Sequence, residues 1–197
     1  MFKLIFILLC ASLFGQDNSS ALLKEVQEKY ASFNDFTAQF TQLVNGKAAA
    51  EGKIFYKKEN KLRAELKNNT IVTNGETIWN YNTRDNKVII NTYDESDPSL
   101  ISFDKILFDY PSKCILSTTK ENGKEALLLK PKKNSELAFT SAKLFIDENG
   151  LVESILVEDS NTGNLNIKLS GYKWNQNLSN SKFTFFPPEG SKVIDLR

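Results

Sequence analysis

The sequence predicts a mainly β fold: one large antiparallel sheet of about eleven strands that curls on itself, with two helical segments covering its concave side. Apolar and polar residues alternate with a period of two along most of the chain, and Asn-Gly and related turn signals recur every eight to twelve residues. A sheet this long must twist and curl, and a bare apolar concave face would aggregate. The two amphipathic segments are therefore the candidates for its cover.

The N-terminus is predicted to be a secretory signal peptide. Lys3 supplies a positive charge, the apolar run 4–14 is too short to span a bilayer comfortably, and Gly15 is followed by polar residues. Cleavage near Gly15 would leave residues 16–197 as a single soluble domain outside the inner membrane. Cys10 leaves a second interpretation open, a lipid-modified N-terminus, although the residue before it is a large leucine.

Helical spacing precedes the first strand. Leu22, Leu23, Val26 and Tyr30 recur three and four residues apart, and Ser19-Ser20 stand before them as a predicted serine cap. From there the period changes to two. The predicted strands are residues 36–41, 52–57, 62–66, 70–73, 76–81, 87–93, 114–118, 125–130, 142–147, 151–159, 165–174 and, as a last short strand, 183–185.

The alternation stops between Asp94 and Lys113. Residues 99–108 are apolar at helical spacing, and Pro98 and Pro111 bracket them. We therefore expect one short helix, inserted between two strands of the sheet.

Composition argues against several classes of function. Lys and Arg number 25 and Asp and Glu 24, so the basic excess of a nucleic-acid-binding protein is missing. The chain has no histidine, which excludes Ser-His-Asp and Cys-His sites, and its two cysteines cannot build a zinc cluster. Acidic pairs such as Asp94-Glu95 and Glu158-Asp159 are typical of solvated turns. We expect neither catalysis nor a cofactor or metal.

Three segments, in order, carry a resemblance that spans the mature chain. They are Phe33–Gln42, a helix-to-strand segment; Ile71–Tyr81, a hairpin with a Gly turn and an aromatic pair; and Phe183–Val193, a C-terminal motif. Together they resemble the LolA family of lipoprotein carriers. The resemblance implies an incomplete, strongly curved β-barrel closed by lid helices. It also implies a monomeric periplasmic carrier that takes triacylated lipoproteins from an inner-membrane ABC-type release complex to an outer-membrane acceptor.

Such a carrier has to hide acyl chains from water in an apolar cavity and then release them. Each buried CH₂ contributes roughly 0.8 kcal/mol, so little polar chemistry is needed. The residues expected to line the cavity of the sheet are Phe36, Phe40, Leu62, Ala64, Trp79, Tyr81 and Ile90. Those expected to form the lid are Ile106, Leu107 and Phe108. The alternative for any one of them is an ordinary place in the core.

One position departs from the family pattern. The family commonly has an Arg-Pro pair between its second and third strands, implicated in latching the lid, whereas this chain has Lys58-Glu59. Lysine lacks the planar fork of arginine. The resemblance therefore implies a weaker latch at Lys58, or one carried by Arg63.

Two other functions stay open. One is a periplasmic lipid- or glycolipid-binding or sensor module of the same fold, because one fold serves several tasks. The other is an enzyme acting on cell-envelope glycans or lipids, against which the absence of histidine and of a nucleophile motif counts. A carrier would accept cargo from an ABC-type complex, whereas a sensor would be tethered or joined to another domain.

Overall fold

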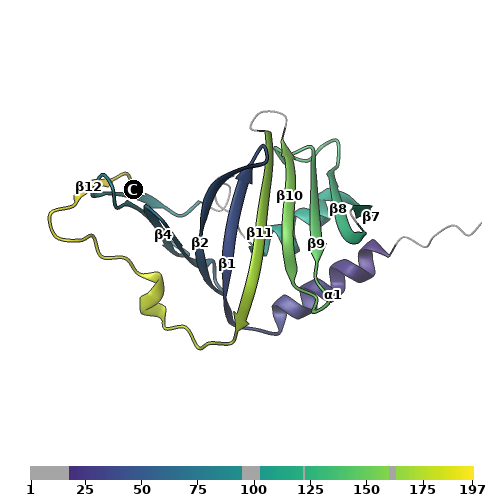
Figure 1. Cartoon of the computed structure of the whole chain (residues 1–197), viewed down its shortest axis with the longest axis horizontal. Coiled ribbons are helices and arrows are strands. Elements are labelled where there is room, and N and C mark those ends of the chain that lie inside the picture. The colour runs from purple at the N-terminus through teal and green to yellow at the C-terminus, as the bar shows by residue number, and fades with distance from the viewer. Residues whose placement is uncertain (1–17, 95–102, 122, 160–162) are drawn as a thin grey trace, which may run out of the picture.

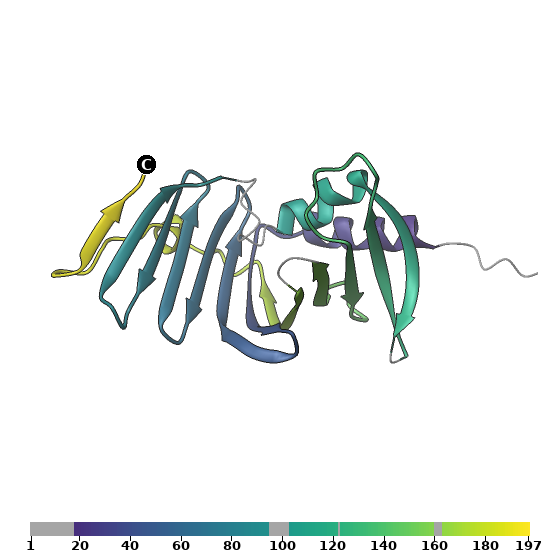
Figure 2. The same cartoon turned by 90° about the horizontal axis from the view of Figure 1, so that it is seen from above.

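The computed structural model describes residues 18–94, 103–121, 123–159 and 163–197. Within them, twelve strands form one curved open sheet with short helices against it (Figures 1 and 2). The predicted mainly β fold is confirmed, with twelve strands rather than about eleven. The strands are β1 (Asp35–Val44), β2 (Lys47–Lys57), β3 (Lys61–Leu66), β4 (Asn69–Asn74), β5 (Thr77–Asn82), β6 (Lys87–Thr92), β7 (Cys114–Glu121), β8 (Lys124–Pro131), β9 (Ser141–Ile146), β10 (Val152–Asp159), β11 (Gly163–Trp174) and β12 (Lys192–Asp195).

The strand order is β12-β6-β5-β4-β3-β2-β1-β11-β10-β9-β8-β7. The chain therefore starts in the middle of the sheet, runs by hairpins to β6, resumes at the opposite edge with β7, and returns to the middle at β11. All pairs are antiparallel except β12 with β6, which is parallel. The parallel pair follows from the long connection that carries the chain from β11 to the far edge.

Helix α1 (Ser19–Ala31) lies against one face of the sheet, and its residues Leu23, Val26 and Tyr30 are buried there, as their spacing predicts. The predicted serine cap is wrong. Ser19 is the first helical residue, so Asn18 occupies the cap position, and it makes no side-chain cap hydrogen bond. The buried stripe holds α1 on the sheet by packing, which is the usual source of helix stability in proteins.

The predicted inserted helix is present, but it continues past Pro111. A π-helical turn, η1 (Lys105–Asp109), is followed directly by α2 (Tyr110–Lys113); residues 99–102 of the expected helix, and Pro98, lie outside the described residues. Pro111 is tolerated at the start of α2 because the first N–H groups of a helix have no partner within the helix, and proline has no N–H. In the π-helical turn, the N–H of Tyr110 bonds to the carbonyl of Lys105, five residues back, where an α-helix would use the residue four back. We call residues 103–113 the lid.

The C-terminal segment differs from its prediction. Residues 183–185 do not form a strand: a 3-10 helix, η2 (Asn180–Phe183), lies here, and the last strand is β12 instead. Figure 1 follows this segment in yellow from the lower end of β11 to β12 at the edge of the sheet. We call residues 175–191 the tail.

The two faces of the sheet have separate cores. The face under α1 and the lid, which we call the helix face, carries the main cluster of buried apolar side chains. The face crossed by the tail, the tail face, carries a smaller one. The buried apolar residues of the tail-face core are Phe55, Val72, Val88, Ile90 and Phe183.

No helix among the described residues is long and apolar enough to cross a membrane. The predicted signal peptide, residues 1–15, lies outside the described residues.

Candidate functional site

An aromatic cluster joins α1, the sheet and the lid on the helix face. The ring of Phe36 on β1 lies 4.9 Å from that of Tyr56 on β2 and 5.3 Å from that of Phe103 in the lid, measured between ring centroids. The ring of Tyr30 on α1 stacks on Phe103 at 6.1 Å. Contacts of this kind contribute beyond the area they bury. The lid is therefore seated in the core through Phe103.

Hydrogen bonds between buried tyrosine hydroxyls also connect α1 to the sheet. The hydroxyl oxygens of Tyr30 and Tyr172 lie 3.1 Å apart, and the Tyr172 hydroxyl donates to the carbonyl of Val152 at 2.7 Å. Burial is the main cause that raises the pKa of Tyr30 to about 12 and that of Tyr172 well above its ordinary value. Both phenols therefore stay neutral at physiological pH and act as hydrogen-bonding groups inside an apolar core.

Hydrogen bonds from β2 and from α1 reach the N-terminal part of the lid, and Lys132 bonds to its C-terminal end. The Tyr56 hydroxyl donates to the Asp104 carboxylate, 2.9 and 3.0 Å from its two oxygens. The side-chain amide of Gln27 on α1 donates to the carbonyl of Leu107 at 2.6 Å. In an α-helix that carbonyl would accept from the residue four positions later, which here is Pro111 and has no N–H. Pro111 therefore does not compete with Gln27 for this carbonyl.

A cavity of about 350 Å³ lies between the end of α1, the β2–β3 turn and the lid. Its lining is mostly aromatic and aliphatic, with Lys58, Glu59 and Asp104 as the charged groups: Tyr30, Ala31, Tyr56, Lys58, Glu59, Phe103, Asp104, Leu107 and Phe108. The ammonium of Lys58 donates to the carbonyl of Ala31, the last residue of α1, at 2.8 Å. Lys58 thus ties the β2–β3 turn to the C-terminus of α1, where a cation is favoured by the helix dipole.

The apolar surface continues past the lid. Leu62, Leu66 and Ile71 share the helix face of β3 and β4 and are only half-buried, and they pack against the edge of the main core. Figures 1 and 2 place α1 and the lid against the half of the sheet that contains β7–β11. The helix face of β3 and β4 is therefore an apolar surface that these helices leave partly open.

Most of the residues predicted to line a cavity lie on this helix face. Phe36, Phe40 and Ala64 are buried there, and Leu62 is half-buried. In the lid, Leu107 is fully buried and Ile106 packs at the margin of the core, whereas Phe108 is 47% exposed at the cavity.

The prediction placed Trp79, Tyr81 and Ile90 on the wrong face. Register pairs Arg63 with Val72, Val72 with Trp79, and Trp79 with Ile90, so these side chains form one row across the tail face. Tyr81 shares that face, and its ring lies 5.5 Å from Phe185 of the tail. Both faces of these strands are apolar, and alternation alone does not distinguish them.

Arg63 is likewise on the tail face, away from the lid. Its guanidinium pairs with Glu65 two residues along the strand at 2.7 Å. It cannot take over the latch, and among the two predicted latch residues only Lys58 reaches an element of the helix face.

The family model described as outer membrane lipoprotein carrier protein LolA matches residues 31–186. The chain belongs to the LolA family. The matched range runs from the end of α1 through the lid to the tail, so it includes both faces of the sheet.

One curated relative is itself named as a lipoprotein carrier, and two uncharacterized proteins are similar to the chain in sequence or in fold. The chain is 30% identical over 179 residues to an outer-membrane lipoprotein carrier protein of Francisella philomiragia, covering 85% of each chain. It is 23% identical over 192 residues to an uncharacterized protein of Methanocaldococcus jannaschii; the match covers 91% of this chain but only 54% of that protein. Among solved structures, an uncharacterized conserved protein of Thermus thermophilus has the same fold, with a TM-score of 0.59 and 13% identity over 90% of this chain and 99% of its own.

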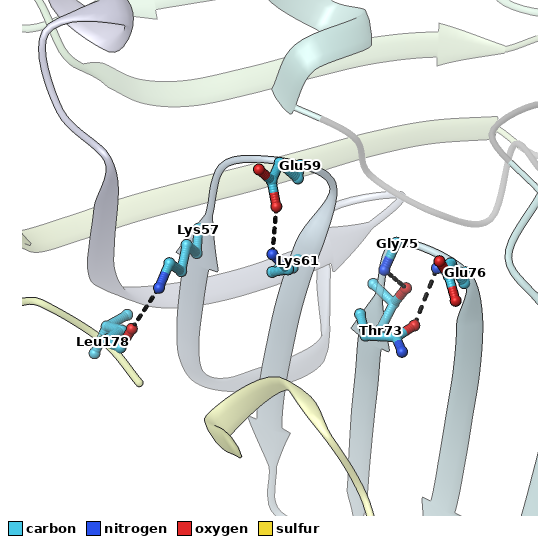
Figure 3. Close-up of polar contacts among 8 residues, drawn as sticks. Lys57, Glu59, Lys61, Thr73, Gly75, Glu76 and Leu178 are labelled. Carbon is cyan, nitrogen blue, oxygen red and sulfur yellow. Dashed lines mark hydrogen bonds and ion pairs between the residues drawn. The ribbon is translucent and has the colours of Figure 1, made fainter. Parts of the chain in front are cut away.

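The tail attaches through residues that the sequence did not single out. The buried carboxylate of Asp35 accepts the backbone N–H groups of Gln176 at 2.7 Å and Leu178 at 2.9 Å. Lys57 donates to the carbonyl of Leu178 at 2.8 Å (Figure 3). Farther along the tail, Phe183 is fully buried on the tail face. The sequence signal available was only an aspartate directly before the first predicted strand; its burial, which calls for hydrogen-bond partners, is a finding of the structure.

The turns beside the cavity are tightly packed. Figure 3 shows Glu59 paired with Lys61 across the β2–β3 turn, and Gly75 donating to Thr73 in the next turn. A Cβ at Gly75 would lie 2.6 Å from the carbonyl oxygen of Glu59, and its φ is +92°. Only glycine fits, so the β4–β5 turn supports the β2–β3 turn from behind.

Proposed function

We propose that the chain is a periplasmic carrier that binds the acyl chains of lipoproteins and shuttles them from the inner to the outer membrane. The observation that carries the proposal is an apolar helix face that continues from the aromatic cluster to Leu62, Leu66 and Ile71 beyond the cover of the helices. The lipoprotein carrier named in the family and in the Francisella relative supports acylated lipoproteins as the cargo. Residues 1–15 are removed on export in this proposal, and residues 16–197 act as one domain.

The lid supplies a way to exchange cargo. Phe103 and Leu107 are buried in the core, and in this proposal acyl chains enter by displacing these side chains and adding CH₂ burial of their own. A ligand shifts such a two-state element only by its differential affinity for the open state. Opening of the lid at Phe103–Leu107 breaks the hydrogen bonds of Tyr56 with Asp104 and of Gln27 with Leu107. Lys132 bonds to the carbonyls of Ser112 and Lys113 at the C-terminal end of the lid.

The proposed partners follow from this task. The protein, as a monomer, receives cargo from an inner-membrane ABC-type release complex and delivers it to an outer-membrane acceptor. The helix face provides an apolar surface for acyl chains, and the proposal assigns it neither catalysis nor a cofactor.

The test incubates the mature protein with membrane vesicles that contain a triacylated lipoprotein and the energised release complex. The expected product is a soluble one-to-one complex. Leu62→Asp places a charge on the open helix face and should abolish the complex. Ile115→Asp places the same charge on the opposite face of β7, where the side chain is already 63% exposed, and should leave it intact.

The contrary result has a clear form. If no lipoprotein complex forms and the protein instead extracts free lipid or glycolipid, the lipoprotein carrier is refuted in favour of a lipid-binding module.

A further inference from the structure

Strand β2 is longer than its neighbour β3, and this leaves part of its edge open. β2 pairs with β1 along the whole stretch from Lys47 to Lys57. Its pairing with β3 begins only at Gly52, opposite Leu66. Among the described residues, the side of Lys47–Glu51 that faces away from β1 thus has no partner strand. Alternate residues of a strand direct their N–H and C=O groups to the same side, so this stretch presents unpaired donors and acceptors in a row.

Gly52 fixes the point where the two strands separate. A Cβ at this position would lie 2.0 Å from the carbonyl oxygen of Glu65, so the close approach of β2 and β3 requires glycine here. Beyond it, a register shift between Gln42 and Leu43 leaves Ala49 without an opposite residue on β1. A bulge of this kind bends the hairpin. The open edge is therefore set by particular residues of β1 and β2.

A groove of about 600 Å³ runs along this open edge. One wall is Ala48–Glu51, and the other is formed by the β3–β4 and β5–β6 turns: Leu66, Lys67, Asn68, Asn69, Asn82, Arg84 and Asp85. The three alanines leave the backbone of β2 accessible. The opposite wall offers side-chain amides, which both donate and accept. The charged residues of the two walls together balance, with Lys67 and Arg84 against Glu51 and Asp85.

We propose that this groove binds an extended polypeptide segment, which adds as a strand to the open edge of β2. The proposal rests on the proposed function, because the segment assigned to the groove is the one that follows the acylated end of the cargo. A strand added to an edge is held mainly by main-chain hydrogen bonds. Because every sequence can form these bonds, this mode of binding suits cargo proteins of varied sequence. At roughly 3.3 Å per residue, the open stretch accommodates about five residues of an added strand.

The position of the groove connects it to the acyl surface. Ala50 and Leu66 line the groove and also pack against the edge of the main core. A cargo whose acyl chains lie on the helix face therefore has an exit for its polypeptide along β2. The groove's balanced charges favour a neutral backbone over an anionic headgroup as its occupant.

The experiment compares four probes on the mature protein: a hexapeptide whose N-terminal cysteine carries three palmitoyl chains, the same acylated cysteine as an amide without peptide, the lipopeptide with N-methyl groups on alternate residues, and the unacylated hexapeptide. The lipopeptide should bind at least tenfold more tightly than the acylated amide, and N-methylation should remove that gain. Amide exchange at residues 47–51 should slow with the lipopeptide and not with the acylated amide.

A variant and its control place the effect in the groove. Ala49→Trp fills the groove and should bring the lipopeptide to the affinity of the acylated amide, whereas Glu76→Trp, on the exposed β4–β5 turn, should change neither. If the lipopeptide and the acylated amide bind the unaltered protein with equal affinity, the proposal that the groove binds polypeptide is refuted. If the unacylated hexapeptide binds and slows amide exchange at residues 47–51, while the acylated amide does not bind, the carrier function is refuted. The proposal that the groove binds polypeptide is then supported. Binding of no probe overturns both.

Discussion

At the scale of single residues, the β2–β3 turn explains why this chain departs from the Arg-Pro pattern of the LolA family. Glu59 and Asn60 both have left-handed backbone conformations, with φ of +70° and +56°. The proline ring holds φ near −65°, so this turn cannot accept proline at position 59. The two left-handed residues are the second and third of the three turn residues, 58–60, between the paired Lys57 and Lys61. The change at Glu59 is thus a change of turn geometry as well as of residue.

Glycine at position 59 should stabilise the protein. Glycine adopts a left-handed conformation without the steric penalty that other residues pay. We expect Glu59→Gly to raise the Tm by roughly 2–4 °C, the shift that a gain of about 1 kcal/mol in the free energy of unfolding produces in a domain of this size. Glu59→Pro should lower it. Thermal unfolding followed by circular dichroism measures both, and a stable Glu59→Pro protein would contradict the observed turn.

Replacing Lys58 should loosen α1 with little cost to the whole protein. Its ammonium caps the C-terminus of α1 at the carbonyl of Ala31, a position where a cation contributes about 0.3–1 kcal/mol. Lys58→Met should lower the free energy of unfolding within that range in urea denaturation. It should also speed amide exchange at residues 32–34, and Lys58→Arg should restore slow exchange. Unchanged exchange in Lys58→Met would argue against a latch.

At the scale of elements, the three motifs that carry the family resemblance meet at the tail. Asp35, from the first motif, accepts two backbone N–H groups at the start of the tail. Tyr81, from the second, packs on Phe185 of the third. Tyr81 of the second motif therefore contacts the tail, which covers the face of the sheet opposite to the one that carries α1 and the lid.

Two phenylalanines of the tail provide a matched test of this anchoring. Phe183 is fully buried on the tail face, and Phe186, three residues on, is 82% exposed. We expect Phe183→Ala to lower the free energy of unfolding by about 3–5 kcal/mol, the usual cost of truncating a buried aromatic residue. Phe186→Ala should stay within about 0.5 kcal/mol of the parent. Similar losses for the two variants in urea denaturation would show that the tail is not seated as described.

The buried tyrosines predict instability in alkali. Burial raises the pKa of Tyr30 from 10.0 to about 12 in the folded protein. The unfolded chain therefore ionises first, and the stability that is fully present below pH 10 is lost as the pH rises towards 12. At about 1.4 kcal/mol per pKa unit, Tyr30 accounts for a loss of about 3 kcal/mol.

Denaturation between pH 9 and 12 measures this loss. Tyr30→Phe cannot ionise at this position, so its stability should fall less steeply over the same interval, although it lacks the hydrogen bond to Tyr172. Parallel curves for the parent and the variant would refute the assignment.

At the scale of the whole molecule, strand order accounts for both covers of the sheet. β6 and β7 lie towards opposite edges, so the connection between them must cross one face, and the lid is part of it. β11 lies in the middle and β12 beyond β6, so the tail must cross the other face. The lid packs on the helix face through Phe103 and Leu107, and the tail packs against β3 and β4 on the tail face, where Phe183 is buried.

Sequence patterns predicted the class of fold and the lid, but only part of the site. Period-two alternation identified the strands, and the spacing of Leu107 and its neighbours identified the lid. Alternation could not assign Trp79, Tyr81 and Ile90 to a face, because β5 and β6 carry apolar side chains on both faces and only register decides. Residues 183–185 of the tail were mistaken for a strand because Phe183 is held by tertiary packing, which the local sequence pattern does not contain.

The most direct test places a photoreactive p-benzoylphenylalanine on each face of one strand. Leu62 points to the helix face and its neighbour Arg63 to the tail face, so the two positions differ by a single residue. With a triacylated lipoprotein loaded from vesicles, cross-links to the acyl chains should form from position 62 and be absent from position 63. Cross-links of equal yield from both positions, or from position 63 alone, would contradict acyl binding on the helix face.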